Sequence, residues 1–127
     1  MTTPFYERVR NLFQDAGLTD DFTIQLLTFR DSGKIADQFM VFRPNGGTAI
    51  RNDLSSEYYV LVDVVGAKDK NGVCATRVQE IIDYVQVNPF TDECLGKIEN
   101  IGGIPAPVLT DEGRLVFRLL FSCAFGS

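Results

Sequence analysis

The 127-residue sequence contains no histidine, and that absence excludes several kinds of functional site. A serine or cysteine nucleophile activated by histidine needs the imidazole as its general base. The usual zinc sites and histidine-ligated haem need the imidazole as a metal ligand. A hydrolase made from this chain would have to use Asp, Glu, Lys, Tyr or Cys alone. We therefore expect no catalytic residues, no metal-binding residues and no cofactor.

Cysteine, long apolar runs and targeting signals are also scarce. The three cysteines, Cys74, Cys94 and Cys123, form no CxxC pair. An odd number without that spacing predicts reduced, mostly buried thiols instead of a disulfide framework. No apolar run approaches the ~20 residues that a membrane-spanning helix needs. The N-terminus lacks the basic start and apolar core of a secretory signal. Together these patterns predict a cytoplasmic product with no membrane partner.

Basic residues are outnumbered by acidic ones. Twelve Lys and Arg against seventeen Asp and Glu give a net charge of −5. Because phosphate neutralisation relies on clustered Lys and Arg, we expect no sequence readout of nucleic acid. The chain is 45% hydrophobic and 23% charged, which is ordinary for a globular fold. Its length predicts a single domain over residues 1–127.

Apolar periodicity predicts two helices and four or five strands. Helical spacing runs from Pro4, in the first helical position after Thr3, to Ala16, and from an N-cap at Asn71 to Asn88. Strand patterns cover 22–29, 38–43, 58–66, 114–125 and, more weakly, 95–101. We expect the first two strands to form a hairpin. The order of elements predicts an α+β fold, with a mostly antiparallel four- to five-stranded sheet and two helices packed on one face.

The predicted sheet has more apolar surface than two helices can cover. The strand 58–66 is apolar on both faces, and alternation places Leu27, Phe29, Phe39 and Val41 on the face without helices. A large exposed apolar patch indicates an interaction surface, and another copy of the chain is the expected partner. The alternative is a sheet coiled tightly enough to bury its own second face.

Charged residues on apolar strands and in one glycine-rich segment are candidates for subunit contacts. Asp63 and Arg118 interrupt apolar strands, so we expect them to pair across the sheet or across a subunit boundary. Segment 43–53 has adjacent glycines after a proline, and loops of this length usually have a function or are disordered. We expect a mobile surface loop or an arm that meets another subunit, with Arg43, Arg51 and Asp53 as contacts.

Several stretches carry a resemblance to a known family. They are the helix from Pro4, the strand Tyr58–Val65, the helix Arg77–Val85, and the closing Gly103–Pro107 followed by Asp111–Phe117. In this order they resemble the tail terminator proteins of long-tailed bacteriophages, the lambda-type small subunits that cap the finished tail tube. That family has no invariant catalytic signature, so the resemblance assigns no individual site residue.

The resemblance implies a structural function in virion assembly. It implies a homo-oligomeric ring, a hexamer on the tail, that stops polymerisation of the tail tube protein. It also implies a surface for a head-completion or connector protein. Such a phage or prophage product would be assembled in the host cytoplasm and reside at the tail–head junction of the virion. In that setting, segment 43–53 is a candidate ring-contacting arm.

Two other classes of function remain open. Another phage neck or tail subunit, such as a head-side connector, would share the small α+β form and the self-assembly. A small ligand-binding domain or enzyme would need convergent polar groups in a cleft. The carboxylate pairs Asp92-Glu93 and Asp111-Glu112 are instead typical of turns. The mass of the protein in solution, with and without tail tubes, would separate these classes.

Overall fold

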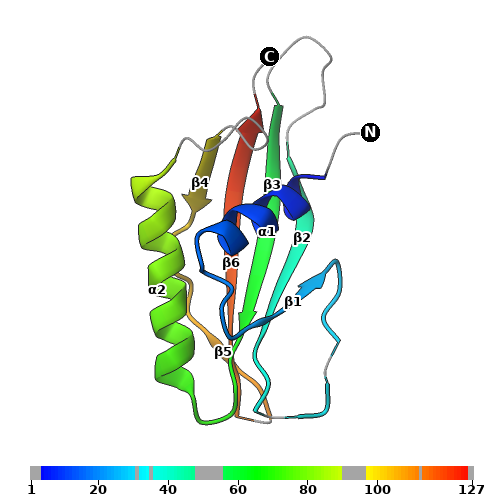
Figure 1. The fold of residues 1–127 in the computed structure, drawn as a ribbon, viewed down its shortest axis with the longest axis vertical. Coiled ribbons are helices and arrows are strands. Elements are labelled where there is room, and N and C mark those ends of the chain that lie inside the picture. The colour runs from blue at the N-terminus through cyan, green and yellow to red at the C-terminus, as the bar shows by residue number, and fades with distance from the viewer. Residues whose placement is uncertain are drawn as a thin grey trace.

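The computed structural model describes residues 4–30, 32–34, 36–47, 56–89, 97–111 and 113–125, and it shows two helices and a six-stranded, mostly antiparallel sheet (Figure 1). The elements are α1 (Phe5–Asp15), β1 (Thr23–Leu26), β2 (Phe39–Gly47), β3 (Ser56–Val65), α2 (Asn71–Val87), β4 (Lys97–Ile101), β5 (Val108–Leu109) and β6 (Leu115–Phe125). The predicted α+β class is confirmed, with one strand more than the predicted maximum.

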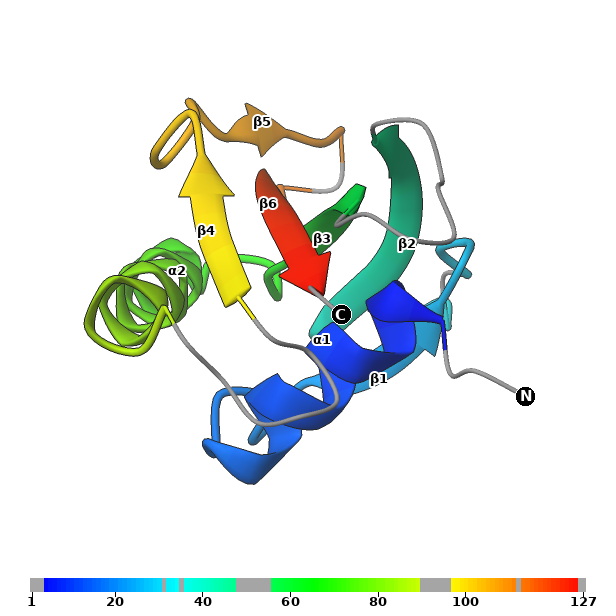
Figure 2. The ribbon, with the colours of Figure 1, turned by 90° about the horizontal axis from the view of Figure 1, so that it is seen from above.

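The core lies between the two helices and one face of the sheet. The strands follow the order β1-β2-β3-β6-β4, and β5 also pairs with β6. Alternate side chains of the central strands point toward the helices and are buried: Met40, Phe42, Val60, Val62, Val64, Phe117, Leu119 and Phe121. We call this side the helix face. The opposite side, which carries no helix, is called the second face (Figure 2).

Helix α1 starts and stops at residues that suit its ends. Pro4 immediately precedes the helix instead of occupying its first position as predicted, and Thr3 lies outside the described residues. Gly17 adopts a left-handed φ of 76°, which glycine tolerates without steric cost. The Leu18 amide then donates to the Phe13 carbonyl oxygen at 2.9 Å, and Leu18 is buried. This is the predicted glycine stop followed by an apolar contact.

Strands β1 and β2 are parallel, so the predicted hairpin is wrong. The register pairs Thr23 with Phe39. The predicted strand 22–29 ends early because Leu27 has a φ of 72°, a left-handed conformation that interrupts extended backbone. Because β1 and β2 run in the same direction, the chain has to return between them to the end at which β1 begins. Parallel strands need a connection of roughly a dozen residues for this return.

Strand β2 continues to Gly47, beyond the point where the sequence predicts a loop. Its register on β3 shifts between Pro44 and Gly47, and Gly46 has a φ of 80°. Such an irregularity allows a strand to carry proline while its pairing continues on both sides. The start of the predicted segment 43–53 is therefore part of the sheet. Residues 48–53 lie outside the described residues.

Helix α2 lies beside β4 and places its apolar stripe in the core (Figure 2). Its buried residues are Cys74, Val78, Ile81, Ile82 and Val85, which match the predicted stripe. Asn71 is the first helical residue and Lys70 precedes the helix without a side-chain cap, so the predicted Asn71 N-cap is wrong. The thiols of Cys74 and Cys123 are free and buried, as expected, and Cys94 lies outside the described residues.

Part of the second face is buried by the chain itself, so the exposed apolar patch is smaller than alternation alone predicts. Phe39, Val41 and Val65 are buried, with exposed fractions of 2%, 0% and 4%. Tyr59 and Leu61, farther along the same face of β3, are only half-buried. The alternative of self-burial therefore holds at one end of the sheet and fails at the other.

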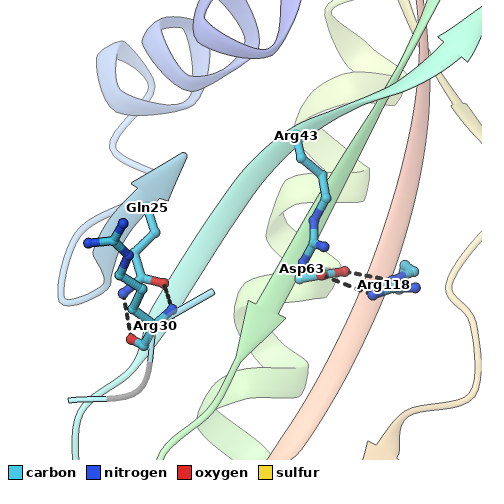
Figure 3. A network of polar contacts seen from close by, with 5 residues as sticks. All are labelled: Gln25, Arg30, Arg43, Asp63 and Arg118. Carbon is cyan, nitrogen blue, oxygen red and sulfur yellow. Dashed lines mark hydrogen bonds and ion pairs between the residues drawn. The ribbon is translucent and has the colours of Figure 1, made fainter. Parts of the chain in front are cut away.

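The connection between β1 and β2 covers the buried end of the second face. The Gln25 side chain donates to the Arg30 carbonyl oxygen at 2.7 Å and accepts from the Arg30 amide at 2.9 Å (Figure 3). The Phe29 ring packs edge-on against Phe39, with centroids 5.2 Å apart. The Arg114 guanidinium lies 5.7 Å from the centroid of the same Phe39 ring. Phe29 and Arg114 thus cover Phe39 at this end of the second face.

Candidate assembly interface

The polar centre of the second face is Asp63, a residue of the central strand β3. The register places Val41 of β2 on one side of it and Arg118 of β6 on the other. The Asp63 side chain is only 5% exposed. A buried carboxylate without partners is strongly unfavourable, so Asp63 requires hydrogen-bond donors from its neighbours.

Two arginines supply those donors from the two neighbouring strands. Arg118 donates from Nε to Asp63 Oδ1 at 2.9 Å and from Nη2 to Oδ2 at 3.3 Å. Arg43 donates from Nη2 to the same Oδ2 (Figure 3). The predicted pairing of Asp63 with Arg118 therefore occurs across the sheet, within one chain.

The cluster of Arg43, Asp63 and Arg118 has an excess of positive charge. The hydrogen bond from Arg118 to Asp63, together with the attraction of the Asp63 charge, raises the pKa of the Arg118 guanidinium above its ordinary value. One carboxylate therefore faces two fixed cations. The Arg118 side chain is also 60% exposed, so part of this charge is presented to solvent.

A cavity of about 250 Å³ lies over this cluster and brings in a third arginine. It is lined by Phe29, Arg43, Asp63, Val65, Thr110, Arg114, Val116 and Arg118. Arg114 is 1% exposed, and its Nη2 donates to the carbonyl oxygen of Lys34. Among the described residues, three guanidinium groups and one carboxylate thus border one cavity. We call this site the arginine cavity.

The structure brings together three of the five residues that the sequence suggests as subunit contacts. Arg43, Asp63 and Arg118 form one cluster, whereas Arg51 and Asp53 lie outside the described residues. Sequence reasoning missed Arg114, although a signal for it exists. Arg114 and Arg118 stand four residues apart at β6, and even spacing along a strand places side chains on one face.

Exposed apolar side chains gather along the chain between β4 and β6. Ile101, Ile104, Val108 and Leu109 have exposed fractions of 42%, 42%, 65% and 62%. We call these four residues the β4–β5 edge, because both strands pair with β6 at the same edge of the sheet. Val108 pairs directly with Val116, which lines the arginine cavity. The apolar edge and the charged cavity are therefore neighbours.

A second cavity, of about 310 Å³, differs in chemistry from the arginine cavity. It lies where α1 begins, beside the ends of β2 and β3, and its described lining is Pro4, Phe5, Tyr6, Pro44, Gly46, Tyr58, Tyr59 and Val60. The Phe5 and Tyr58 rings stack there with centroids 4.2 Å apart. None of these described lining side chains is charged, so the cavity offers mainly apolar contact, with tyrosine hydroxyls as the polar groups.

The described residues lack two further kinds of feature. No group of three or more His, Cys, Asp or Glu side chains in those ranges is arranged to hold a metal ion. No helix in the same part of the chain combines the length and apolarity needed to cross a membrane. The second face instead carries paired guanidinium and carboxylate groups.

Comparison with known proteins adds a family and a fold. The model of a family described as phage tail termination protein matches residues 2–127. One solved protein structure superposes with a TM-score of 0.55, over 95% of this chain and 96% of that chain, at 11% sequence identity. This second likeness is one of fold alone. No curated protein sequence matches the chain.

Proposed function

Because this chain belongs to the phage tail termination protein family, and is thus a structural component of the phage tail, we propose that it forms a ring on the end of the tail tube. The ring stops polymerisation of the tube and offers the surface to which the head joins. The observation that carries this proposal is the family match, which extends over residues 2–127 and so includes nearly every element of the fold.

The proposed ring is a hexamer on the tail, with three kinds of partner. Copies of this chain contact one another, the tail tube protein lies on one side of the ring, and a head-completion or connector protein lies on the other. The protein then belongs at the tail–head junction of the virion, after assembly in the cytoplasm of the host. Arg43, Asp63 and Arg118 are the proposed contact residues among those described.

The exposed edges of the sheet support assembly into a ring. The sheet begins at β1 and ends at β4 and β5, so its two edges have different sequences. A contact between two different edges is head-to-tail, and head-to-tail contacts generate rings when the rotation closes. The β4–β5 edge supplies the apolar side chains that such a contact would bury.

The proposal is tested with purified components. Tail tube protein is allowed to polymerise with and without this chain, and tube lengths and tube ends are measured by electron microscopy. We expect shorter tubes with a ring of density on one end. Native mass spectrometry of the capped ends, or of rings in solution, gives the number of subunits. Tubes of unchanged length and uncapped ends would refute the proposal.

The same experiment separates the alternative of a head-side connector. A connector would form rings that bind the head-side portal assembly and leave tube growth unaffected. A stable monomer that binds neither tubes nor other copies would instead favour a small ligand-binding domain or enzyme. The family description favours termination of the tail over both alternatives.

A further inference from the structure

We propose that the arginine cavity binds a carboxylate side chain from a second copy of this chain. This inference rests on the proposed ring and identifies the chemistry of one of its contacts. The site combines charge, shape and an apolar margin in one place. The lining residues come from β2, β3, β6, the turn after β5 and the connection after β1, so the fold assembles the cavity from distant parts of the sequence.

Hydrogen-bond donors in the cluster outnumber its own acceptors. Arg43 and Arg118 together carry about ten N–H donors. Three of their contacts go to Asp63, which has few acceptor positions left. Arg43 Nε is buried and has no hydrogen-bond partner among the described residues. A second carboxylate at the cavity would accept from donors that Asp63 cannot satisfy, in the paired geometry that guanidinium groups favour.

Charge complementarity points to another copy of the chain as the source of that carboxylate. The described lining of the arginine cavity has three guanidinium groups and one carboxylate, while the whole chain has a net charge of −5. The described lining is thus opposite in charge to the chain as a whole. When copies meet head-to-tail, a positive site on one faces a negative surface on the next, and complementary potentials fix the register of such contacts.

The margin of the cavity is suited to exclude water from a charged contact. Phe29 lines the cavity and is 39% exposed, and Val108 lies beside the lining residue Val116 and is 65% exposed. Apolar residues around a charged contact shield it from solvent, and partial desolvation strengthens the attraction between opposite charges. The arrangement resembles the centre of a protein interface more than a solvated surface ion pair.

A phosphate backbone fits the same site less well than a carboxylate does. Nucleic acid is bound by rows of exposed cations that follow the strand. Here Arg114 is 1% exposed and Arg43 carries only a 27% exposed side chain, and Asp63 stands between Arg43 and Arg118. A single side-chain carboxylate can enter a cavity of about 250 Å³, whereas a continuous strand would contact only its margin.

The test places a negative charge at the margin without touching the arginines. Val108→Asp is compared with Val108→Asn, which has nearly the same size and the same loss of apolar surface. In the assay of ring formation on tail tubes, we expect Val108→Asp to need on the order of 10-fold more protein than Val108→Asn at low salt. The difference should shrink at 1 M NaCl, because salt at that concentration screens the interaction between charges beyond a few ångströms. Circular dichroism checks that both variants fold.

A photo-crosslinker at position 108 identifies what lies against the cavity. Benzoylphenylalanine replaces Val108, assembled rings on tubes are irradiated, and the captured peptide is identified by mass spectrometry. We expect a peptide of a second copy that contains Asp or Glu. Changing that acidic residue to its amide should then reproduce the effect of Val108→Asp.

The remaining outcomes each overturn the inference. Equal assembly of Val108→Asp and Val108→Asn, with the wild type still capping tubes, rejects the carboxylate site and leaves the proposed function intact. Capture of the tube protein at position 108 shows that the site faces the tube. Binding of a labelled DNA duplex that Val108→Asp weakens, with unchanged assembly, assigns the cavity to phosphate. Failure of the wild type to cap tubes rejects the proposed function itself.

Discussion

Asp63 links three strands through side chains as well as through the backbone. Its carboxylate is almost fully buried, and its two arginine partners come from β2 and β6. Replacing one member of such a cluster leaves the others without a counter-charge, and the cost depends on how deeply the remaining groups are buried. The three residues differ greatly in exposure, so their substitutions should differ in effect.

The variant Asp63→Asn should lower the free energy of unfolding by about 1–3 kcal/mol, because Arg43 and Arg118 lose their charged acceptor. Arg118→Gln should cost no more than about 1 kcal/mol, since the Arg118 side chain is 60% exposed and Asp63 keeps Arg43. Urea unfolding of the free subunit measures both values. An equal loss for the two variants would show that the buried carboxylate is not the centre of the cluster.

The two buried thiols make the free energy of unfolding depend on pH in the alkaline range. Burial raises the pKa of Cys74 to about 11 and that of Cys123 to about 12, from an ordinary value of 9.0. Above pH 9 the unfolded chain therefore releases thiol protons that the folded chain retains. Stabilisation from this source is complete below pH 9 and is lost as the pH rises toward 11–12.

This dependence is measured in a Cys94→Ser background, which removes the thiol outside the described residues. We expect the free energy of unfolding to decrease between pH 8 and pH 10.5. The decrease should be smaller in the additional variant Cys123→Ala, by at most about 1.4 kcal/mol per pH unit for one thiol. Lys and Tyr titrate alike in both proteins, so the difference in slope reports Cys123. Identical slopes would contradict the prediction.

At the scale of elements, the junction between β3 and α2 depends on close packing at Gly66. A Cβ added at Gly66 would lie 2.8 Å from Cys74 Cβ and 3.1 Å from its Sγ. Both atoms belong to the buried stripe of α2, so the helix would have to move away from the sheet. Glycine at this position allows α2 to start so near the end of β3.

Gly66→Ala should therefore lower the free energy of unfolding by about 1–3 kcal/mol, as overpacking in a core generally does. The control is Gly72→Ala at the start of α2, where an added Cβ meets nothing within 4 Å. That control should be neutral or stabilising by up to about 1 kcal/mol, because alanine favours helix. Thermal unfolding of both variants gives the comparison. Equal stability of the two would rule out a packing constraint at Gly66.

The sequence predicts the type of most elements but not the direction of β1. Apolar periodicity identifies both helices and the strands 58–66 and 114–125, because burial on one or both faces leaves a repeating pattern. The same period of two fits a parallel and an antiparallel partner equally well, so it cannot distinguish a hairpin from a crossover. The left-handed backbone at Leu27, which ends β1, has no counterpart in residue type.

The candidate site was only partly predictable for a related reason. A charged residue on an apolar strand is visible in sequence, and Asp63 and Arg118 were found in this way. Arg43 comes to the same carboxylate because β2 continues on β3 past Phe42 in one register, which depends on the whole sheet. The cavity above the three residues needs the crossover after β1 to fold back over the second face, and that fold-back is a tertiary event.

For the whole molecule, the second face divides into an end closed by the chain itself and a more open end. Phe29 and Arg114 close one end, while Leu61 and Leu120 remain half-buried at the other. The predicted excess of apolar surface is therefore smaller than alternation alone suggests. Four exposed apolar side chains lie together on the β4–β5 edge, and this adds the edge of the sheet to the subunit contact proposed at the arginine cavity.

The exposed β4–β5 edge predicts a variant that folds normally but fails to assemble. Leu109 is 62% exposed on β5, and lysine on an edge strand opposes pairing with another chain. Leu109→Lys should change the free energy of unfolding of the free subunit by no more than about 0.5 kcal/mol, as exposed substitutions usually do. It should nevertheless abolish ring formation on tail tubes.

The matched control is Val87→Lys at the end of α2, where an apolar side chain is 79% exposed. The control should form rings as the wild type does, since a cation at the C-terminus of a helix is favourable and Val87 is not one of the four residues of the β4–β5 edge. Rings formed equally by Leu109→Lys and the wild type would show that copies meet through another surface.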